Sequence, residues 1–233
     1  MNGYLVPGIS MTTATILAFL GSQKLHRRFP KIWLAPIMIT PLILVLGLLF
    51  SRIPYTHYYA DTDILTVFLQ PATVAFAVPL YLHRATIKKY AGPLIASLSS
   101  GILVALLSNL SLSMVLGLQH RLTLSLVPRS ITTPLAMDVS SMLGGIPVWT
   151  ATFVIITGVF GSVIGPWLAT ILNVKTPIGK GTMLGVGAHG IGTAAAFKWG
   201  EAEGTIASLS MVLAGCTTVL VAPWVVDLVQ HWF

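Results

Sequence analysis

Three short polar groups interrupt otherwise apolar sequence, and their residue types suit the binding of a small anion. The groups are residues 70–73 (QPAT), 128–134 (PRSITTP) and 188–193 (AHGIGT). A helix that breaks inside a membrane leaves free N–H groups and the positive end of its dipole at the break. Beside such breaks, the cationic side chains and the hydroxyls would bind and orient an anion. We therefore predict a substrate site formed by Gln70, Pro71, Thr73, Arg129, Ser130, Thr132, Thr133, His189, Gly190, Gly192 and Thr193.

The third group lies in residues 181–197, which carry no charge and contain five glycines around His189. A plain transmembrane helix needs about 20 apolar residues and has little use for this much glycine. Non-helical backbone at membrane depth is tolerated only where it is buried in protein or lines a cavity. The segment therefore predicts a helix that breaks part-way through the membrane, with the working site around His189.

Each of these residues also has a purely structural interpretation. His189 would then hydrogen-bond a carbonyl, and Arg129 would reach a membrane interface as a topology anchor. The serines and threonines would join helices, and the glycines would only permit tight packing. An intramembrane histidine indicates function by default. For proton coupling the candidates are His189, Glu203 and Asp138, although the two carboxylates also fit simple charges at loop ends.

Composition places the chain in a membrane. Hydrophobic residues make up 55% and charged residues 8% of the sequence, and the mean hydropathy is +0.87. The formal net charge of +7 comes from short basic runs between apolar segments, such as residues 24–31 and 84–89. This is the positive-inside pattern, so the charge indicates topology rather than binding to nucleic acid. The single cysteine, Cys216, excludes an intramolecular disulfide.

The apolar stretches indicate an internal duplication. They lie near residues 5–22, 32–51, 64–82, 91–118, 122–137, 146–174, 181–197 and 204–226. The last four follow the first four at an offset of roughly 115 residues, a pattern that is common in transporters. The two Gly/Pro-interrupted members, 64–82 and 181–197, correspond, and a break is expected near Gln70-Pro71. Such a matching pair is the best sequence indication of a transporter's binding site.

The charges favour seven spans over eight. If residues 122–137 re-enter the membrane instead of crossing it, Lys175 and Lys180 lie inside and Glu201 and Glu203 outside. The predicted fold is an all-α integral membrane protein with about seven transmembrane helices, a re-entrant segment and two broken helices. It forms one polytopic domain, residues 1–233, with inverted-repeat halves of approximately 1–118 and 119–233.

Enzymatic functions find little support. The sequence contains no HExxH, no GxSxG and no GxxxxGK[ST] motif. Six aspartates and glutamates in total make a paired-carboxylate hydrolase hard to build. His57, His120 and His189 fall on separate segments without the spacing of metal ligands. We expect no enzyme activity, no bound metal and no cofactor.

Four ordered motifs resemble the LrgB/CidB family of antiholin-like, murein-hydrolase-regulator membrane proteins. They are residues 69–81 (LQPATVAFAVPLY), 128–137 (PRSITTPLAM), 188–194 (AHGIGTA) and 203–211 (EGTIASLSM). The resemblance covers nearly the whole chain. It implies a multi-pass protein of the cell's inner (cytoplasmic) membrane, and it implies a small LrgA/CidA-like membrane protein as a partner.

The resemblance implies two functions. One is control of murein hydrolase activity and cell lysis together with a holin-like partner. The other is transport of small monocarboxylates, because the plastid glycolate/glycerate translocator is similar to this family. The residues favour transport, since a lytic pore needs neither mid-membrane helix breaks nor a basic site among hydroxyls. We therefore expect a secondary transporter of pyruvate, glycolate or lactate, proton-coupled and homodimeric, with the antiholin-like regulator as the alternative.

Overall fold

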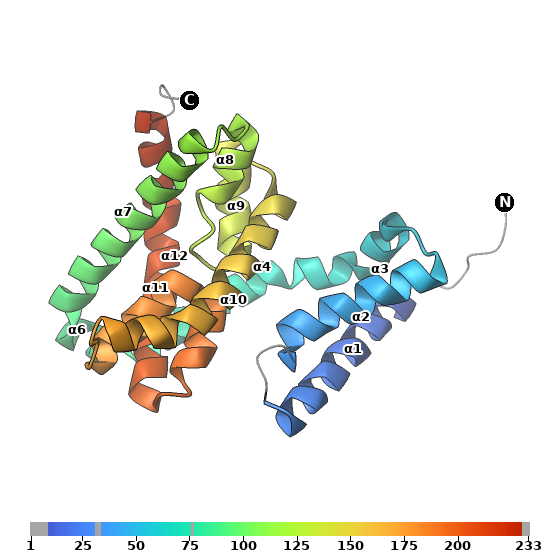
Figure 1. Ribbon diagram of the computed structural model, residues 1–233, viewed down its shortest axis with the longest axis horizontal. Helices are drawn as coiled ribbons and strands as arrows, with labels where there is room; N and C mark the ends of the chain where they lie inside the picture. Colours follow the sequence, from blue (N-terminus) through green and yellow to red (C-terminus); the bar gives the residue numbers. More distant parts are fainter. Residues whose placement is uncertain (1–8, 31–33, 76, 230–233) are drawn as a thin grey trace. The chain divides into compact units, whose positions relative to one another are not determined.

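The computed structural model describes residues 9–30, 34–75 and 77–229, and every regular element in these ranges is a helix (Figure 1). The chain forms two compact units, Met1–Ala72 and Thr73–Phe233. The helices are α1 (Ile9–Arg28), α2 (Pro36–Ser51), α3 (Tyr55–Val67), α4 (Leu69–Ala75), α5 (Ala77–Leu82), α6 (Arg84–Lys89), α7 (Ala91–Val115), α8 (His120–Leu126), α9 (Thr133–Leu143), α10 (Pro147–Ile171), α11 (Pro177–Ala196) and α12 (Glu201–Val229).

The first unit is built from α1, α2 and α3, with α1 packed against both of the others. Proline at the first position of α2 fits a helix start, where its missing N–H is not needed. Arg52 ends that helix in the left-handed conformation. Two hydroxyls of α1 bind α3, since Thr12 Oγ1 donates to Asp61 O at 2.6 Å and Thr15 Oγ1 lies 3.1 Å from Tyr58 Oη.

The break predicted at Gln70-Pro71 is not found at these residues, which lie within α4; the nearest helix boundary is between α3 and α4. The chain is not one helix over residues 64–82, because α3 ends at Val67, α4 begins at Leu69 and α5 begins at Ala77. The side chains of Gln70 and Thr73 lie outside the described residues. Pro71, the third predicted site residue here, is exposed.

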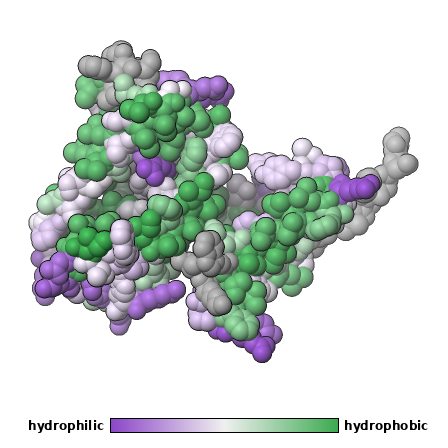
Figure 2. All heavy atoms as spheres, in the orientation of Figure 1, coloured by the Kyte–Doolittle hydropathy of each residue, from purple (hydrophilic) through white to green (hydrophobic). Residues whose placement is uncertain are grey.

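Among the described residues, three helical segments of the second unit are long and apolar enough to cross a membrane: α7 with 25 residues, α10 with 25, and residues Glu201–Leu228 of α12 with 28. At 1.5 Å per residue each exceeds the roughly 30 Å of a hydrocarbon core. Large apolar side chains lie exposed along them, including Val104, Phe160, Trp167 and Leu220, and apolar residues dominate the visible face of this unit (Figure 2). This exterior suits lipid rather than water.

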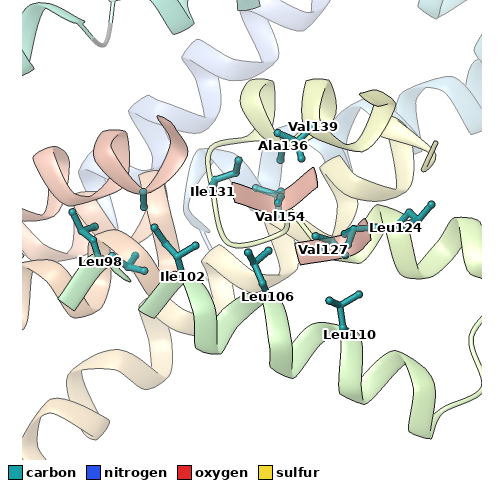
Figure 3. Close-up of a cluster of buried hydrophobic side chains, with 14 of the residues drawn as sticks. Leu98, Ile102, Leu106, Leu110, Leu124, Val127, Ile131, Ala136, Val139 and Val154 are labelled. Atoms are coloured by element: carbon teal, nitrogen blue, oxygen red, sulfur yellow. The ribbon is translucent and has the colours of Figure 1, made fainter. Parts of the chain in front are cut away.

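The core of the second unit forms along one stripe of α7. Its buried residues recur every fourth position, at Leu94, Leu98, Ile102, Leu106 and Leu110. They pack with buried residues of α8, α9 and α10 and of the segment between α8 and α9 (Figure 3). The all-helical membrane fold is therefore confirmed, whereas the count of about seven spans and the inverted repeat remain predictions.

Candidate functional site

Helix α11 reverses direction at His189. This residue has φ 39° and ψ −127°, while its neighbours on both sides are helical. Lys180 and Trp199 would lie about 28 Å apart along a straight helix, yet Lys180 Nζ is 5.6 Å from the centre of the Trp199 ring. Leu184 of the first limb packs with Ala196 of the second. We call residues 177–199 the His189 hairpin.

This reversal differs from the predicted crossing by residues 181–197. The predicted break is present, but the chain returns to the end from which it came. Gly181 lies against Glu203 of α12, where a Cβ would be 2.7 Å from the Glu203 carbonyl oxygen. Glu201 and Glu203 therefore lie at the same end of the unit as Lys180, not at the opposite end as the charge count suggested.

Glycines let the His189 hairpin approach its neighbours closely. A Cβ at Gly185 would meet the Ala207 carbonyl oxygen of α12. On α10, a Cβ at Gly158 would lie 2.5 Å from His189 Cε1, and one at Gly161 would lie 2.7 Å from Ala188 Cβ. Small residues of this kind permit backbone contact between helices in membranes. Gly192 also packs, against the Leu184 carbonyl within the hairpin.

The His189 side chain is buried, with 4% of its surface exposed. Its Nε2 lies 2.9 Å from the carbonyl oxygen of Val154 on α10. A carbonyl only accepts hydrogen bonds, so Nε2 carries the proton and Nδ1 is left to accept one. Thr193 Oγ1 donates to the His189 carbonyl at 2.9 Å, which satisfies a backbone group at the break. A non-glycine residue with positive φ is strained, and such strain clusters at functional sites.

A second reversal occurs between α8 and α9. The backbone N–H of Ile146 donates to Ser125 Oγ at 2.7 Å, so the chain returns to the end of α8 after α9. Gly145 permits this contact, because a Cβ there would lie 2.9 Å from the Ser125 nitrogen. We call residues 120–146 the Arg129 hairpin, and its tip is the non-helical segment 127–132.

Arg129 lies at this tip and is held by two uncharged side chains. Its Nε donates to Asn109 Oδ1 of α7 at 2.6 Å, and its Nη1 donates to Thr157 Oγ1 of α10 at 3.1 Å. Asn109 in turn donates to the Val127 carbonyl at 3.3 Å. Nη2 makes no hydrogen bond, and Arg129 has no carboxylate partner, within the described part of the chain. A guanidinium with an unused edge can bind a carboxylate.

The two tips meet at one turn of α10, which they reach from opposite ends. The base of the Arg129 hairpin lies at the N-terminus of α10. Between this base and the tip, Thr150 Oγ1 of α10 donates to Ser140 Oγ of the hairpin at 2.7 Å. The His189 hairpin starts at the other end, where Gly165 lies against Leu184. Residues 154–158 then receive both tips: Val154 and Gly158 contact His189, and Thr157 contacts Arg129. Val154 and Ile131 of the Arg129 hairpin belong to the same buried apolar cluster (Figure 3).

Two further predicted residues, Thr132 and Ser130, stand at the Arg129 tip. Thr132 is 6% exposed, and its buried Oγ1 has no hydrogen-bond partner. It precedes α9, whose first N–H groups lack partners inside the helix. Ser130 lines a cavity of about 560 Å³ between α7 and α11. The tip therefore offers a cation, hydroxyls and backbone N–H groups together, the groups that an anion requires.

Of the remaining predicted residues, Asp138 and Glu203 stand apart from the two tips, whereas Thr133 and Gly190 adjoin them. Asp138 is exposed on α9, and Glu203 lies at the start of α12. Neither is joined by a hydrogen bond or ion pair to Arg129 or His189 in the part that the structure describes. Thr133 begins α9. A Cβ added at Gly190 would meet only Met211 Sδ, at 3.9 Å. No cluster of His, Cys, Asp and Glu that could hold a metal occurs among the described residues.

The sequence prediction missed Asn109 and Thr157, the two residues that hold Arg129. Asn109 is 2% exposed and interrupts an otherwise apolar, membrane-length helix. A polar amide inside such a segment was the available signal. Thr157 gave no comparable signal, because threonines are common in membrane helices.

Comparisons with known proteins place the chain in a family. The model of the LrgB-like family matches residues 15–228. Among curated proteins of Bacillus subtilis (strain 168), "Uncharacterized protein YwbG" is 43% identical over 94% of this chain and 98% of its own length. "Uncharacterized protein YxaC" is 34% identical over 91% and 92%. "Antiholin-like protein LrgB" is 36% identical over 82% and 85%. No solved structure matches the chain.

Proposed function

The chain belongs to the LrgB-like family of membrane proteins, and from this premise we propose that it transports small monocarboxylates across the cell membrane. The single observation that carries the proposal is Arg129. It is a part-buried cation that only neutral side chains hold, and it stands where two opposed hairpin tips meet inside a membrane-length helix bundle. Burying an unpaired charge inside a membrane protein costs free energy, so such a charge indicates that it binds a ligand.

In the proposed mechanism a carboxylate binds the free edge of Arg129. The hydroxyl of Thr132 and the first N–H groups of α9 bind its second oxygen. His189 Nδ1, which is free to accept a proton, couples proton movement to the substrate. Movement of the hairpins against α10 then exposes the site to one side of the membrane at a time.

The experiment is uptake of labelled pyruvate, glycolate and lactate into proteoliposomes, with and without an inward proton gradient. We expect saturable uptake of one acid, lost in His189→Ala while the amount of protein in the membrane stays normal. Replacement of the alternative proton carriers, in Asp138→Asn and Glu203→Gln, separates their roles from that of His189. Retained proton-driven uptake in His189→Ala would contradict the coupling role.

A second candidate function is regulation of murein hydrolases and cell lysis. The name of one relative, "Antiholin-like protein LrgB", favours it more directly than any relative's name favours transport. The protein would then act with a small LrgA/CidA-like membrane protein or as a homo-oligomer. Reconstitution with and without such a partner tests this candidate. Passage of large solutes without saturation would support it, and saturable flux of one acid would not.

A further inference from the structure

The cavity that Ser130 lines is an elongated space between α7 and α11 with a volume of about 560 Å³. Its lining combines apolar residues, among them Ile178, Met183 and Val186, with glycines and hydroxyls. None of the residues that line it is charged.

The cavity runs from one end of the second unit to the Arg129 tip. Pro93 and Thr176, near the starts of α7 and α11, line its outer part. Ala105 and Ser130 line its inner part. Pro93 and Ala105 are twelve residues apart on one helix, which corresponds to a depth of about 18 Å. Ser130 directly follows Arg129, so the inner end lies beside the proposed anion site.

The outer end lies on the more basic side of the unit. Arg84, Lys88 and Lys89 precede α7, and Lys175, Lys180 and Lys198 lie at or next to the two ends of the His189 hairpin, where they outnumber Glu201 and Glu203. Because Lys180 lies over Trp199, both ends of that hairpin are on the same side. An excess of lysine and arginine marks the cytoplasmic side of a membrane protein.

Gly187 differs from the packed glycines of the same hairpin. A Cβ at Gly181 or Gly185 would collide with α12, whereas a Cβ at Gly187 would meet nothing within 4 Å. Packing against a neighbouring helix therefore does not require glycine at position 187. The missing side chain instead leaves the cavity wide at its inner end.

We propose that this cavity is a water-filled vestibule through which a small organic anion moves between the cytoplasm and Arg129. The inference rests on the proposed transport function for its ligand, but the vestibule itself is tested without transport. Because no charged residue lines it, a carboxylate meets no cationic binding site before Arg129. Its hydroxyl at Ser130 supplies a hydrogen bond beside Arg129, whereas the Ser97 hydroxyl donates to the Pro93 carbonyl at 2.7 Å.

The first test is thiol labelling in membrane vesicles of known orientation. In a Cys216→Ser background, Thr176→Cys and Ser130→Cys place single thiols at the outer and inner ends. We expect a charged, membrane-impermeant thiosulfonate to label both from the cytoplasmic side. Ser140→Cys, at a fully buried position of the Arg129 hairpin, is the control and should stay unlabelled. Labelling of Ser130→Cys only from the other side, only by a membrane-permeant maleimide, or not at all would overturn the proposal.

The second test blocks the passage. Gly187→Leu fills open space, and we expect at least a tenfold loss of charged-reagent labelling at Ser130→Cys with labelling at Thr176→Cys unchanged. The matched control is Gly47→Leu on α2, where a Cβ also meets nothing within 4 Å. Unchanged labelling of Ser130→Cys in Gly187→Leu would overturn the route. If both labelling results are as expected but no acid is transported, the vestibule is supported and the proposed transport function is contradicted.

Discussion

The two hairpins reach the same turn of α10 by different means. The His189 hairpin turns at a single strained residue within a glycine-rich helix, and its polar groups are paired: His189 with Val154, and Thr193 with the His189 carbonyl. The Arg129 hairpin turns through a loop bounded by prolines. That loop leaves Thr132 Oγ1 and the Nη2 edge of Arg129 unpaired.

This difference separates two roles within one site. A tip whose His189 Nε2 and backbone carbonyl are hydrogen-bonded, and whose Gly185 and Gly192 are packed, is held in one geometry. A tip with buried, unsatisfied groups gains free energy when a ligand satisfies them. We therefore expect substitutions of the packed glycines in the His189 hairpin to act mainly on stability, and substitutions around Arg129 to act mainly on anion binding.

The largest effect on folding is expected from Gly185→Leu. The new side chain would collide with the backbone of Ala207, and such overpacking costs about 3 kcal/mol. The melting temperature of the purified protein in detergent should fall steeply. Gly187→Ala, two residues further along, is the control and should leave it unchanged, because its Cβ meets nothing. Equal melting temperatures for the two variants would contradict the packed hairpin.

The largest effect on binding is expected from Arg129→Gln. Loss of a charged hydrogen-bonding partner, at about 3 kcal/mol, should lower kcat/KM for the transported acid roughly 100-fold. Stability should stay the same or rise, because a part-buried cation without a counter-ion is removed. Arg129→Lys keeps the charge and should retain part of the uptake. A steep fall in melting temperature in Arg129→Gln would instead mean a structural role.

A smaller effect is expected when the partner of Arg129 becomes an acid. In Asn109→Asp the new carboxylate, next to Nε, competes with the substrate for the guanidinium, and we expect affinity to fall about tenfold, or 1.4 kcal/mol. Asn173→Asp adds the same charge at an exposed position with positive φ and is the control. Isothermal titration with the transported acid measures both, and equal affinities would contradict anion binding at Arg129.

The smallest effect is expected from Thr157→Val, which removes the acceptor of Nη1 without changing side-chain size. One hydrogen bond is worth about 1 kcal/mol, so KM should rise about fivefold with kcat little changed. Thr152→Val on the same helix removes a hydroxyl that bonds only its own backbone, at Val148 O. A similar KM in the two variants would show that Thr157 does not position Arg129.

The sequence predicted the membrane class, the family and the residues at both tips. Apolar stretches of membrane length and the basic runs between them are local properties, so they can be read without coordinates. The glycines and prolines around His189 and Arg129 mark breaks for the same reason, because they restrict or free the backbone at their own positions. Those parts of the interpretation needed no knowledge of packing.

Only the tertiary structure decided where the broken segments lead and what they touch. Sequence alone could not distinguish a bend at His189 from a full reversal, because that depends on close contacts with Gly158 of α10 and Ala207 of α12. It also could not pair Arg129 with Asn109 and Thr157, which are 20 and 28 residues away. Local residue types set what each segment is able to do, but contacts between distant helices select which of those possibilities has the lowest free energy.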